Sequence, residues 1–550
     1  METADGPAWS SRREYVLSPE ERASEEAFRR DDARMGAEAA ERFGRSTARA
    51  VPSRARSLAR AASHRLIASR PGRFLRRLER RGGREAIRLR SRLEHVVLGR
   101  PGSNRRLYEV VPEPADASSG NALLARATTP YLVFLRFGGV LSTAGAAALD
   151  DALDGETSVQ LIYGDSRAPS GLRVKAPAFS PFRLRSEDYL GPVVAVSVRA
   201  LRERGGFSAS ADGAQILDFA LRTPEREARR LRTVLGWGPA VDTREGEPAE
   251  RAVAVVRRAL ADDGVAARVE ATRFGRRRVS YERLHPSTIS VVIPTRGGSG
   301  SIAGSDRTFV VDAVRGLLER GTTHDLEIVV VADDATPQRV VDELDAVAGD
   351  RLKLVRWSSA FDFSAKMNRG AAAASGEYLL LLNDDIELIE PASIERMLSI
   401  VQQPGVGLVG ALLYFEDGSI QHLGHLYHGG GAGHVGFGIT PGARAPIETL
   451  AITREVSGVT AACAIISREL FREVGGFSLA FPGNYNDVDL SMKVRMRGYT
   501  ILCAGDTAFY HFESKTRDAR VLESELDDLQ ARWGTRIERD RYSREQEHSR

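Results

Sequence analysis

The sequence has no long apolar run and very little cysteine. No stretch approaches the roughly 20 apolar residues that a membrane-spanning helix needs, and the amino-terminal segment has no apolar region of the kind found in signal peptides. Cys463 and Cys503 are the only cysteines, and neither has the Cys or His spacing of a zinc knuckle or redox pair. These absences predict a cytoplasmic protein with two buried free thiols.

Positive charge is concentrated in one part of the 550-residue chain. Between Arg45 and Arg106 there are nineteen Arg and three Glu, a balance of +16 within a net charge of +4. Leu, Ile, Phe and Val recur there at roughly helical spacing, which is typical of an interfacial helix on anionic lipid. A solvated, partly helical arm is the alternative. Nucleic acid is the less favoured partner, because this segment has almost no aromatic residues to stack on bases.

From Thr288 onwards, apolar strand-like runs alternate with helical segments. The runs "TISVVIPT", "LEIVVVADD", "LKLVRW" and "EYLLLLNDD" are separated by amphipathic or Ala-rich segments, a pattern that predicts βαβ units on a parallel sheet. The carboxyl ends of parallel strands meet at one edge of a sheet. That edge should carry Thr295, Asp333, Asp334, Asp384 and Asp385.

Several acids on one edge repel one another unless a positive group lies among them. Carboxylates suit Mg²⁺ or Mn²⁺, which complete their coordination with substrate phosphates. The chain has no P-loop motif, and "GGSGSIAG" (297–304) lacks the spacing of a dinucleotide fingerprint, so we expect it to be a flexible loop. The pattern therefore favours a nucleoside diphosphate with a divalent cation, although Asn383-Asp384-Asp385 could simply close the strand as a turn.

Three further motifs have a structural and a functional interpretation. In "NYNDVDLSMKVRMRG", Asp487 could cap a helix or take a proton from an attacking hydroxyl. In "YHFESKTR", His511 could be a satisfied loop histidine or a cation ligand. In "QHLGHLYHGGGAGH", four of the ten histidines fall within thirteen residues, which suits either a zinc site or a glycine-rich lid.

Taken in order, these motifs resemble a known family. "VVIPT", "VVVADDAT", "FSAKMNRGAAAASGEYLLLLNDD", "SGVTAACAIISRELFREVGGF", "NYNDVDLSMKVRMRGY" and "YHFESKTR" are similar to the inverting family-2 glycosyltransferases with a GT-A fold, especially rhamnosyltransferase-like enzymes of bacterial surface polysaccharides. The resemblance covers about Thr288 to Asp518. Two positions depart from the family pattern, Asn383 in the D-x-D-like motif and Asn486 in place of an acid before Asp487.

The resemblance implies a role for each matching position. Asp487 would be the catalytic base, and the cation, Mn²⁺ or Mg²⁺, would be held by Asp385 and His511 with Asp384 beside them. The nucleotide-binding positions would be Pro294, Thr295, Asp333, Asp334, Lys366, Asn368 and Asn383, with Asp334 holding the base. Lys515 and Arg517 would contact phosphate. His422 and His434 would belong to a loop on the acceptor side.

The middle of the chain looks like a degenerate copy of the same domain. "TTPYLVFLRFGGVL" (128–141) aligns with "SGEYLLLLNDDIEL" (375–388), and "VSVRALRERGGF" (196–207) matches "ISRELFREVGGF" (466–477) at six of twelve positions. Arg136-Phe137-Gly138 replaces the acidic motif and cannot hold a divalent cation. We therefore expect this copy to be truncated and inert.

The expected fold class is α/β, with a GT-A, Rossmann-like nucleotide-binding domain in the carboxy-terminal half. The expected segments are an Arg-rich, partly helical or disordered arm at 1–105, a degenerate glycosyltransferase-like module at 106–223, a helical bridge at 224–286, the catalytic domain at 287–520 and a charged helix or tail at 521–550.

The expected function is metal-dependent, inverting sugar transfer from a nucleotide diphosphate sugar to a glycan or lipid-linked acceptor in the synthesis of cell-surface polysaccharide or glycolipid. The alternatives are a non-catalytic scaffold that binds glycan or nucleotide, and a nucleotidyltransferase. We expect a cytoplasmic location, peripheral at the inner face of the plasma membrane if the basic arm binds lipid.

Overall fold

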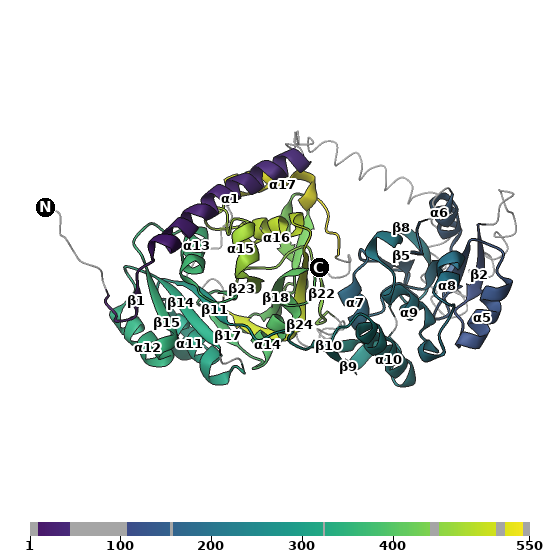
Figure 1. The fold of residues 1–550 in the computed structure, drawn as a ribbon, viewed down its shortest axis with the longest axis horizontal. Helices are drawn as coiled ribbons and strands as arrows, with labels where there is room; N and C mark the ends of the chain where they lie inside the picture. Colours follow the sequence, from purple (N-terminus) through teal and green to yellow (C-terminus); the bar gives the residue numbers. More distant parts are fainter. Residues whose placement is uncertain are drawn as a thin grey trace.

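The computed structural model describes residues 9–43, 107–154, 158–241, 243–322, 325–440, 450–512 and 523–542. Two α/β bodies lie side by side, the one built from the carboxy-terminal half on the left of Figure 1 and the one built from the middle of the chain on the right. The predicted α/β class is therefore confirmed. None of the described helices has both the length and the hydropathy required of a membrane-spanning segment.

One half of the larger sheet contains the four strands predicted from the apolar runs. β15 (Leu352–Trp357), β14 (Leu326–Asp333), β11 (Ile289–Thr295) and β16 (Tyr378–Leu382) are adjacent and parallel. Their side chains are almost all buried, as expected for strands covered on both faces. The carboxyl ends of β11, β14 and β16 therefore carry the predicted polar residues to one edge.

The same sheet continues with strands of mixed direction. β23 (Cys463–Ser467) is antiparallel to β16 and to β18 (Val406–Tyr414), β18 is parallel to β24 (Thr500–His511), and β17 (Ile386–Leu388) is antiparallel to β24. Helices α11 (Phe309–Arg315), α12 (Gln338–Ala348), α13 (Phe363–Ala373) and α14 (Ser393–Val401) connect the strands. Both cysteines are buried and free, as predicted.

The glycine-rich run at 297–304 is not the flexible loop that we expected. It enters a two-stranded hairpin, in which β12 (Ser299–Ile302) pairs antiparallel with β13 (Ser305–Thr308). Ala303 and Gly304 both have positive φ at the turn. The sequence pattern did not predict this hairpin, because β12 is rich in glycine and serine and its partner β13 is polar, so neither strand has an apolar run.

The middle body contains a second sheet, in the order β2 (Tyr108–Pro112), β3 (Tyr131–Leu135), β7 (Val193–Ser197), β5 (Leu161–Arg167), β8 (Ala228–Trp237) and β4 (Val140–Leu141). The strand directions along it are parallel, antiparallel, antiparallel, parallel and antiparallel. The segment β11-β16-β23-β18-β24-β17 of the larger sheet has the same sequence of directions.

Two predicted segment boundaries are wrong. Residues 9–43 do not belong to a free arm, because β1 (Glu14–Tyr15) adds to the edge of the larger sheet and α1 (Pro19–Phe43) packs along that body. β8 lies inside the predicted bridge but pairs in the middle sheet, which leaves α10 (Glu247–Asp262) and the hairpin of β9 (Ala267–Ala271) and β10 (Arg277–Tyr281) as the connection. α17 (Glu523–Trp533), in the predicted charged helix or tail, packs against α1, and its Trp533 is 1% exposed. The basic segment itself lies outside the described residues.

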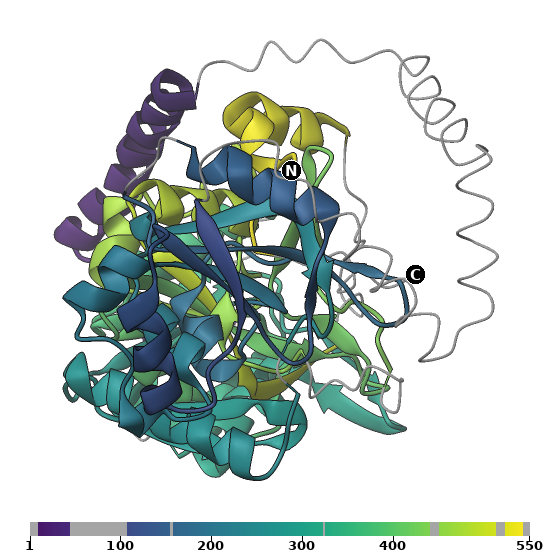
Figure 2. The same ribbon diagram turned by 90° about the vertical axis from the view of Figure 1, so that its right-hand side faces the viewer.

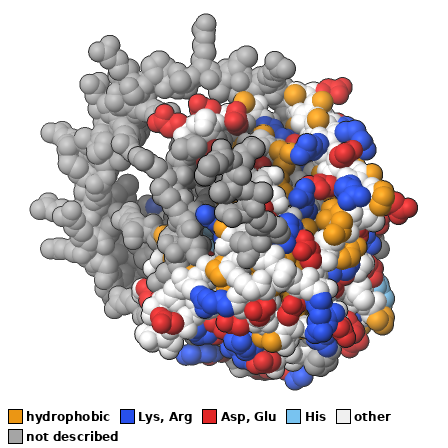
Figure 3. All heavy atoms as spheres, turned by 90° about the vertical axis from the view of Figure 1, so that its left-hand side faces the viewer, with side chains coloured by type: hydrophobic (Ala, Val, Ile, Leu, Met, Phe, Trp, Pro, Cys, Tyr) orange, Lys and Arg blue, Asp and Glu red, His pale blue; other side chains and the backbone are white. Residues whose placement is uncertain are grey.

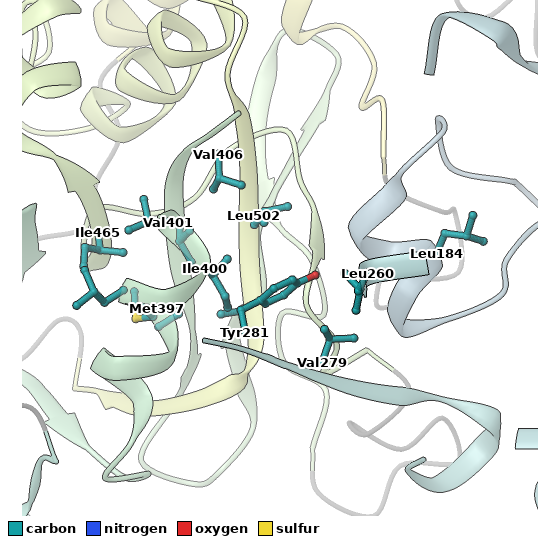
Figure 4. Close-up of a cluster of buried hydrophobic side chains, with 14 of the residues drawn as sticks. Leu184, Leu260, Val279, Tyr281, Met397, Ile400, Val401, Val406, Ile465 and Leu502 are labelled. Atoms are coloured by element: carbon teal, nitrogen blue, oxygen red, sulfur yellow. The ribbon is translucent and has the colours of Figure 1, made fainter. Parts of the chain in front are cut away.

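A continuous apolar cluster joins the two bodies. Leu184, Leu260, Val279 and Tyr281 lie on one side of it, and Met397, Ile400, Val401 and Leu502 lie on the other (Figure 4). Beside this cluster, the buried carboxylate of Glu455 accepts hydrogen bonds from the backbone N–H groups of Phe182 and Arg183, at 2.7 and 2.9 Å. The bridge thus contributes to a shared core.

Charged side chains of both signs are mixed on the described surface. On the face in Figure 3, Lys, Arg, Asp and Glu side chains are interspersed across the described part, and hydrophobic side chains are scattered singly or in small groups. Isolated apolar side chains of this kind are ordinary on a protein surface.

Candidate active site

A cavity of about 670 Å³ lies where the strand ends of the larger sheet meet α16 (Asn486–Met496). Most of the predicted site residues come together in its wall. Those that line it are Pro294, Thr295, Lys366, Asn383, Asp384, Asp385, His434, Asp487 and His511. Its size suits a small-molecule ligand, since such sites are commonly about 300–1,000 Å³.

Strand pairing brings His511 beside Asp385, 126 positions earlier in the chain. β17 and β24 are antiparallel with Ile386 opposite His511, and the imidazole Nε2 lies 3.2 Å from Asp385 Oδ1. The other ring nitrogen, Nδ1, donates to Gln421 Oε1 at 2.6 Å. With the proton on Nδ1, Nε2 of the neutral ring is unprotonated, and an unprotonated imidazole nitrogen can bind a cation.

The residues present fit a divalent cation. Asn383 Nδ2 lies 3.2 Å from His511 Nε2, and Asn383 Oδ1 is buried without a hydrogen-bond partner. A buried carbonyl oxygen, a carboxylate and an imidazole are together a suitable donor set for Mn²⁺ or Mg²⁺. Within the described ranges, no cluster of three or more His, Cys, Asp or Glu is placed to hold a metal. The side-chain amide oxygen of Asn383 would therefore be the third cation ligand, beside Asp385 and His511.

The pKa values of the two adjacent carboxyls are shifted in opposite directions. Burial raises the pKa of Asp385, but the neighbouring His511 outweighs this effect and holds the pKa below its ordinary value. Burial and the nearby Asp385 charge raise the pKa of Asp384 to about 7, even though the Thr295 hydroxyl donates to its Oδ2 at 2.7 Å. Asp384 faces Thr295, whereas Asp385 faces His511, so Asp385 is the more direct candidate ligand.

The predicted nucleotide-binding acids lie beside the cavity. Lys366 pairs with the carboxylate of Asp333 and donates to the Thr295 carbonyl at 2.8 Å, and burial lowers the pKa of its ammonium group. Asp334, which is more exposed, accepts from Arg356 at 2.9 Å. Neither acid is part of the cavity lining, whereas Lys366, Pro294 and Thr295 are.

Asn368, a predicted nucleotide-binding residue, does not line the cavity and has a structural contact. Its Nδ2 donates to the carbonyl of Phe477 and its Oδ1 accepts from the Phe477 N–H, both at 2.8 Å. Asn368 and Lys366 are two positions apart on α13, so their side chains point to different sides of the helix. Lys366 faces the cavity, whereas Asn368 is hydrogen-bonded to the backbone of Phe477.

Asp487 lies in the first turn of α16, with its carboxylate at the cavity. The N-cap position is Tyr485, which has a φ of 60° and no side-chain cap bond, so Asp487 is not the cap. Its Oδ1 accepts from the Val488 N–H at 2.8 Å, and its Oδ2 lies 3.5 Å from His425 Nε2. Burial raises the pKa of Asp487, but His425 and His434 outweigh this effect and lower it to about 2.

The histidine cluster forms a compact wall. His422 ends β19 (Ile420–His422), His425 begins β20 (His425–His428), and His434 ends β21 (Gly431–His434) opposite His425. The Thr460 N–H donates to His422 Nε2 at 3.2 Å, so His422 Nδ1 carries the proton shared with His434 Nδ1, 2.6 Å away. Burial lowers the pKa of both His422 and His434, the latter to about 4. His434 reaches the cavity, and His422 lies behind it.

The hairpin that carries these histidines is held in place, which contradicts the expectation of a flexible lid. The Tyr427 N–H donates to Asp540 Oδ2 at 3.1 Å, and the Gly429 N–H donates to the Glu538 carbonyl at 3.1 Å. Gln530 Nε2 donates to the Gly430 carbonyl at 3.3 Å. Hydrogen bonds with the carboxy-terminal segment therefore fix the position of the hairpin of β20 and β21.

Sequence reasoning missed two residues of this site. Gln421 orients His511, and His425 faces Asp487, but neither lies next to its partner in sequence. His425 was visible as a member of the histidine cluster, whereas nothing in the sequence distinguishes Gln421. Lys515 and Arg517, the predicted phosphate contacts, lie outside the described residues.

Part of the chain is similar to known proteins. Residues 290–475 match the model of Glycosyl transferase family 2. The chain is 28% identical over 445 residues to the O-antigen biosynthesis protein RfbC of Myxococcus xanthus, covering 76% of this chain and 34% of that protein. It is 29% identical over 452 residues to the uncharacterized protein y4gI of Sinorhizobium fredii, covering 76% and 48% respectively.

Likeness to solved structures is more distant. The mannosyltransferase PcManGT from Pyrobaculum calidifontis, in complex with GDP-Man and Mn²⁺, is 15% identical with a TM-score of 0.31, and the match covers 46% of this chain and 70% of that one. The chain spans about half or less of the length of the curated relatives it matches. The family match agrees with the predicted fold class. The similarity to Glycosyl transferase family 2 is thus confined to residues 290–475, about a third of the chain.

Proposed function

We propose that the protein is a metal-dependent, inverting glycosyltransferase, which moves a hexosyl or rhamnosyl unit from a nucleotide diphosphate sugar to a glycan acceptor in polysaccharide synthesis. The observation that carries the proposal is that Asp487 and the pair of Asp385 and His511 line one cavity, to which the matched residues 290–475 contribute Asp385. The match to an O-antigen biosynthesis protein supports a surface polysaccharide as product.

Each residue has one task in this reaction. Asp385, His511 and Asn383 would hold Mn²⁺ or Mg²⁺, which neutralises the charge that develops on the departing diphosphate. Asp487, ionised because its pKa is about 2, accepts the proton of the acceptor hydroxyl. The hydroxyl oxygen bonds to the anomeric carbon as the bond from that carbon to the diphosphate oxygen breaks, and the electron pair leaves with the diphosphate.

The nucleotide would lie over Pro294 and Thr295, beside Lys366, with Asp333 and Asp334 at its outer edge. Lys366 is fixed between Thr295 and Asp333, so its position does not depend on the ligand. His434 would face the acceptor side, neutral at pH 7 and able to donate a hydrogen bond to a hydroxyl. His422 would hold it there.

We also propose that the middle body is an inert tandem copy of the catalytic domain. The identical order of strand directions over six strands supports a duplication. At the place of the acidic motif, Arg136 is 1% exposed and forms ion pairs with Asp188 at 2.5 Å and Glu113 at 3.2 Å. A buried guanidinium with two acid partners occupies the place where a cation would bind, so this body would position the enzyme or its acceptor.

Release of nucleoside diphosphate from a panel of nucleotide sugars, with and without Mn²⁺, tests the proposed function. We expect turnover of at least one donor only with the metal, and a loss of at least about 100-fold in Asp487→Asn with donor binding retained. A scaffold would bind without turnover. A nucleotidyltransferase would release pyrophosphate from a nucleoside triphosphate, with no effect of Asp487→Asn.

A further inference from the structure

The described amino-terminal segment, residues 9–43, lies far outside the family 2 domain in sequence but packs against it in space. α1 runs along the outside of the larger body next to α13, α15 (Arg468–Glu473) and α17, as both ribbon views show (Figures 1 and 2). Trp9, Phe28, Met35 and Ala39 are each at most 2% exposed. The segment is therefore part of the core of this body.

One end of the segment contacts the strand ends on the donor side. The Trp9 indole N–H donates to the Asp333 carbonyl at 2.8 Å, and the Arg356 guanidinium stacks on the Trp9 ring at 3.9 Å. Arg356 donates to both oxygens of Glu14, at 2.8 and 3.0 Å, and to Asp334 at 2.9 Å. Trp9 and Glu14 thus set the position of the arginine that holds Asp334.

The other end of the segment contacts the helix that carries Asp487. The Asp32 carboxylate accepts from Lys493 at 2.9 Å and from Arg532 at 2.7 Å. Asp489, 0% exposed, lies 3.1 Å from Lys493 and 3.0 Å from Arg532. The negative charges of the two aspartates therefore compensate the positive charges of Lys493 and Arg532 next to the first turn of α16.

This cluster is sensitive to the loss of any member. Burial raises the pKa of Asp32, but Lys493 and Arg532 outweigh it, so the net shift is downward. Removing one partner from a buried ion network leaves an uncompensated charge, which neighbouring groups relieve by moving. A displacement of α16 by a fraction of an ångström changes where Asp487 meets the acceptor hydroxyl, and small misplacements of catalytic groups are costly in rate.

We propose that residues 9–43 are a built-in positioning element of the active site, with separate effects at its two ends. Glu14 and Trp9 hold Arg356, and through it Asp334, in the geometry that binds the donor. Asp32 holds Lys493 and α16, and through them Asp487, in the geometry for proton transfer. This inference rests on the proposed function.

Steady-state kinetics of the full-length protein, with the donor identified by the nucleotide-sugar panel, tests the inference. For Glu14→Gln we expect the donor KM to rise about 5- to 10-fold with kcat within twofold of wild type. For Asp32→Asn we expect kcat to fall at least about 10-fold with donor KM within twofold. Glu20→Gln and Asp31→Asn, both on α1 but outside both contacts, are matched controls that should behave as wild type.

Loss of folding is separated from loss of positioning by a second variant. Asp32→Glu keeps the charge but lengthens the side chain, so we expect it to fold and to have a kcat between wild type and Asp32→Asn. Circular dichroism at the assay temperature establishes the folded fraction. Wild-type constants for Glu14→Gln and Asp32→Glu, or losses that merely follow the folded fraction, would overturn this inference. A wild-type protein that turns over no donor would instead overturn the proposed function.

Discussion

The interaction between His425 and the Asp487 carboxylate should contribute a measurable coupling free energy. In a double-mutant cycle, His425→Gln removes the imidazole that lies 3.5 Å from Asp487 Oδ2, and Asp487→Asn removes the charge. The pKa of Asp487 is about 2 against an ordinary 3.8, and each pKa unit corresponds to about 1.4 kcal/mol. We therefore expect a coupling free energy of at most about 2 kcal/mol at pH 7, because His434 and the Val488 N–H also lower the pKa of Asp487.

The coupling has a defined pH dependence. Because the pKa of Asp487 is depressed in the folded protein, the stability it contributes is fully present above pH 4 and is lost as the pH falls from about 4 towards 2. The assay is the free energy of unfolding from urea titrations of wild type, both single variants and the double variant at pH 7 and pH 3. His428→Gln, exposed at the other end of β20, is the control. A coupling below about 0.5 kcal/mol at pH 7 would refute the reasoning.

Three further changes test other parts of the structure. Gln421→Leu should weaken Mn²⁺ binding about 10- to 100-fold by releasing the imidazole of His511, as measured by calorimetry with nucleoside diphosphate present. Arg136→Met should lower the free energy of unfolding by about 3–5 kcal/mol, because Asp188 stays buried without its partner, yet leave donor KM unchanged. Asn368→Ala should cost about 1–3 kcal/mol for each backbone group left unsatisfied, again with no change in donor KM.

The sequence predicted those parts of the fold that depend on local pattern. The buried strands β11, β14, β15 and β16 are rich in apolar residues and alternate with helical segments, so their existence and parallel direction followed from the sequence pattern. The acids at their ends followed from the same topology. By contrast, the two-residue strand β1 has no such pattern, and it forms only because the edge of β15 is available.

Long-range charge pairing explains most of what the sequence did not show. Asp32 and Lys493 are 461 positions apart, and no local signal distinguishes Asp32 from Asp31 beside it. The pairing of Asn368 with Phe477 likewise depends on how α13 meets the turn before α16. The histidine hairpin looked like a free glycine-rich loop, because the groups that hold it come from the carboxy-terminal end of the chain.

The central claim, that Asp385 and His511 hold one divalent cation beside the proton-accepting Asp487, is tested most directly by electron paramagnetic resonance titration of Mn²⁺ in the presence of nucleoside diphosphate. We expect wild type and Asp487→Asn to bind one Mn²⁺ with equal affinity, and Asp385→Asn and His511→Gln to bind it at least about 10-fold more weakly. Equal Mn²⁺ binding by all four proteins would contradict the account.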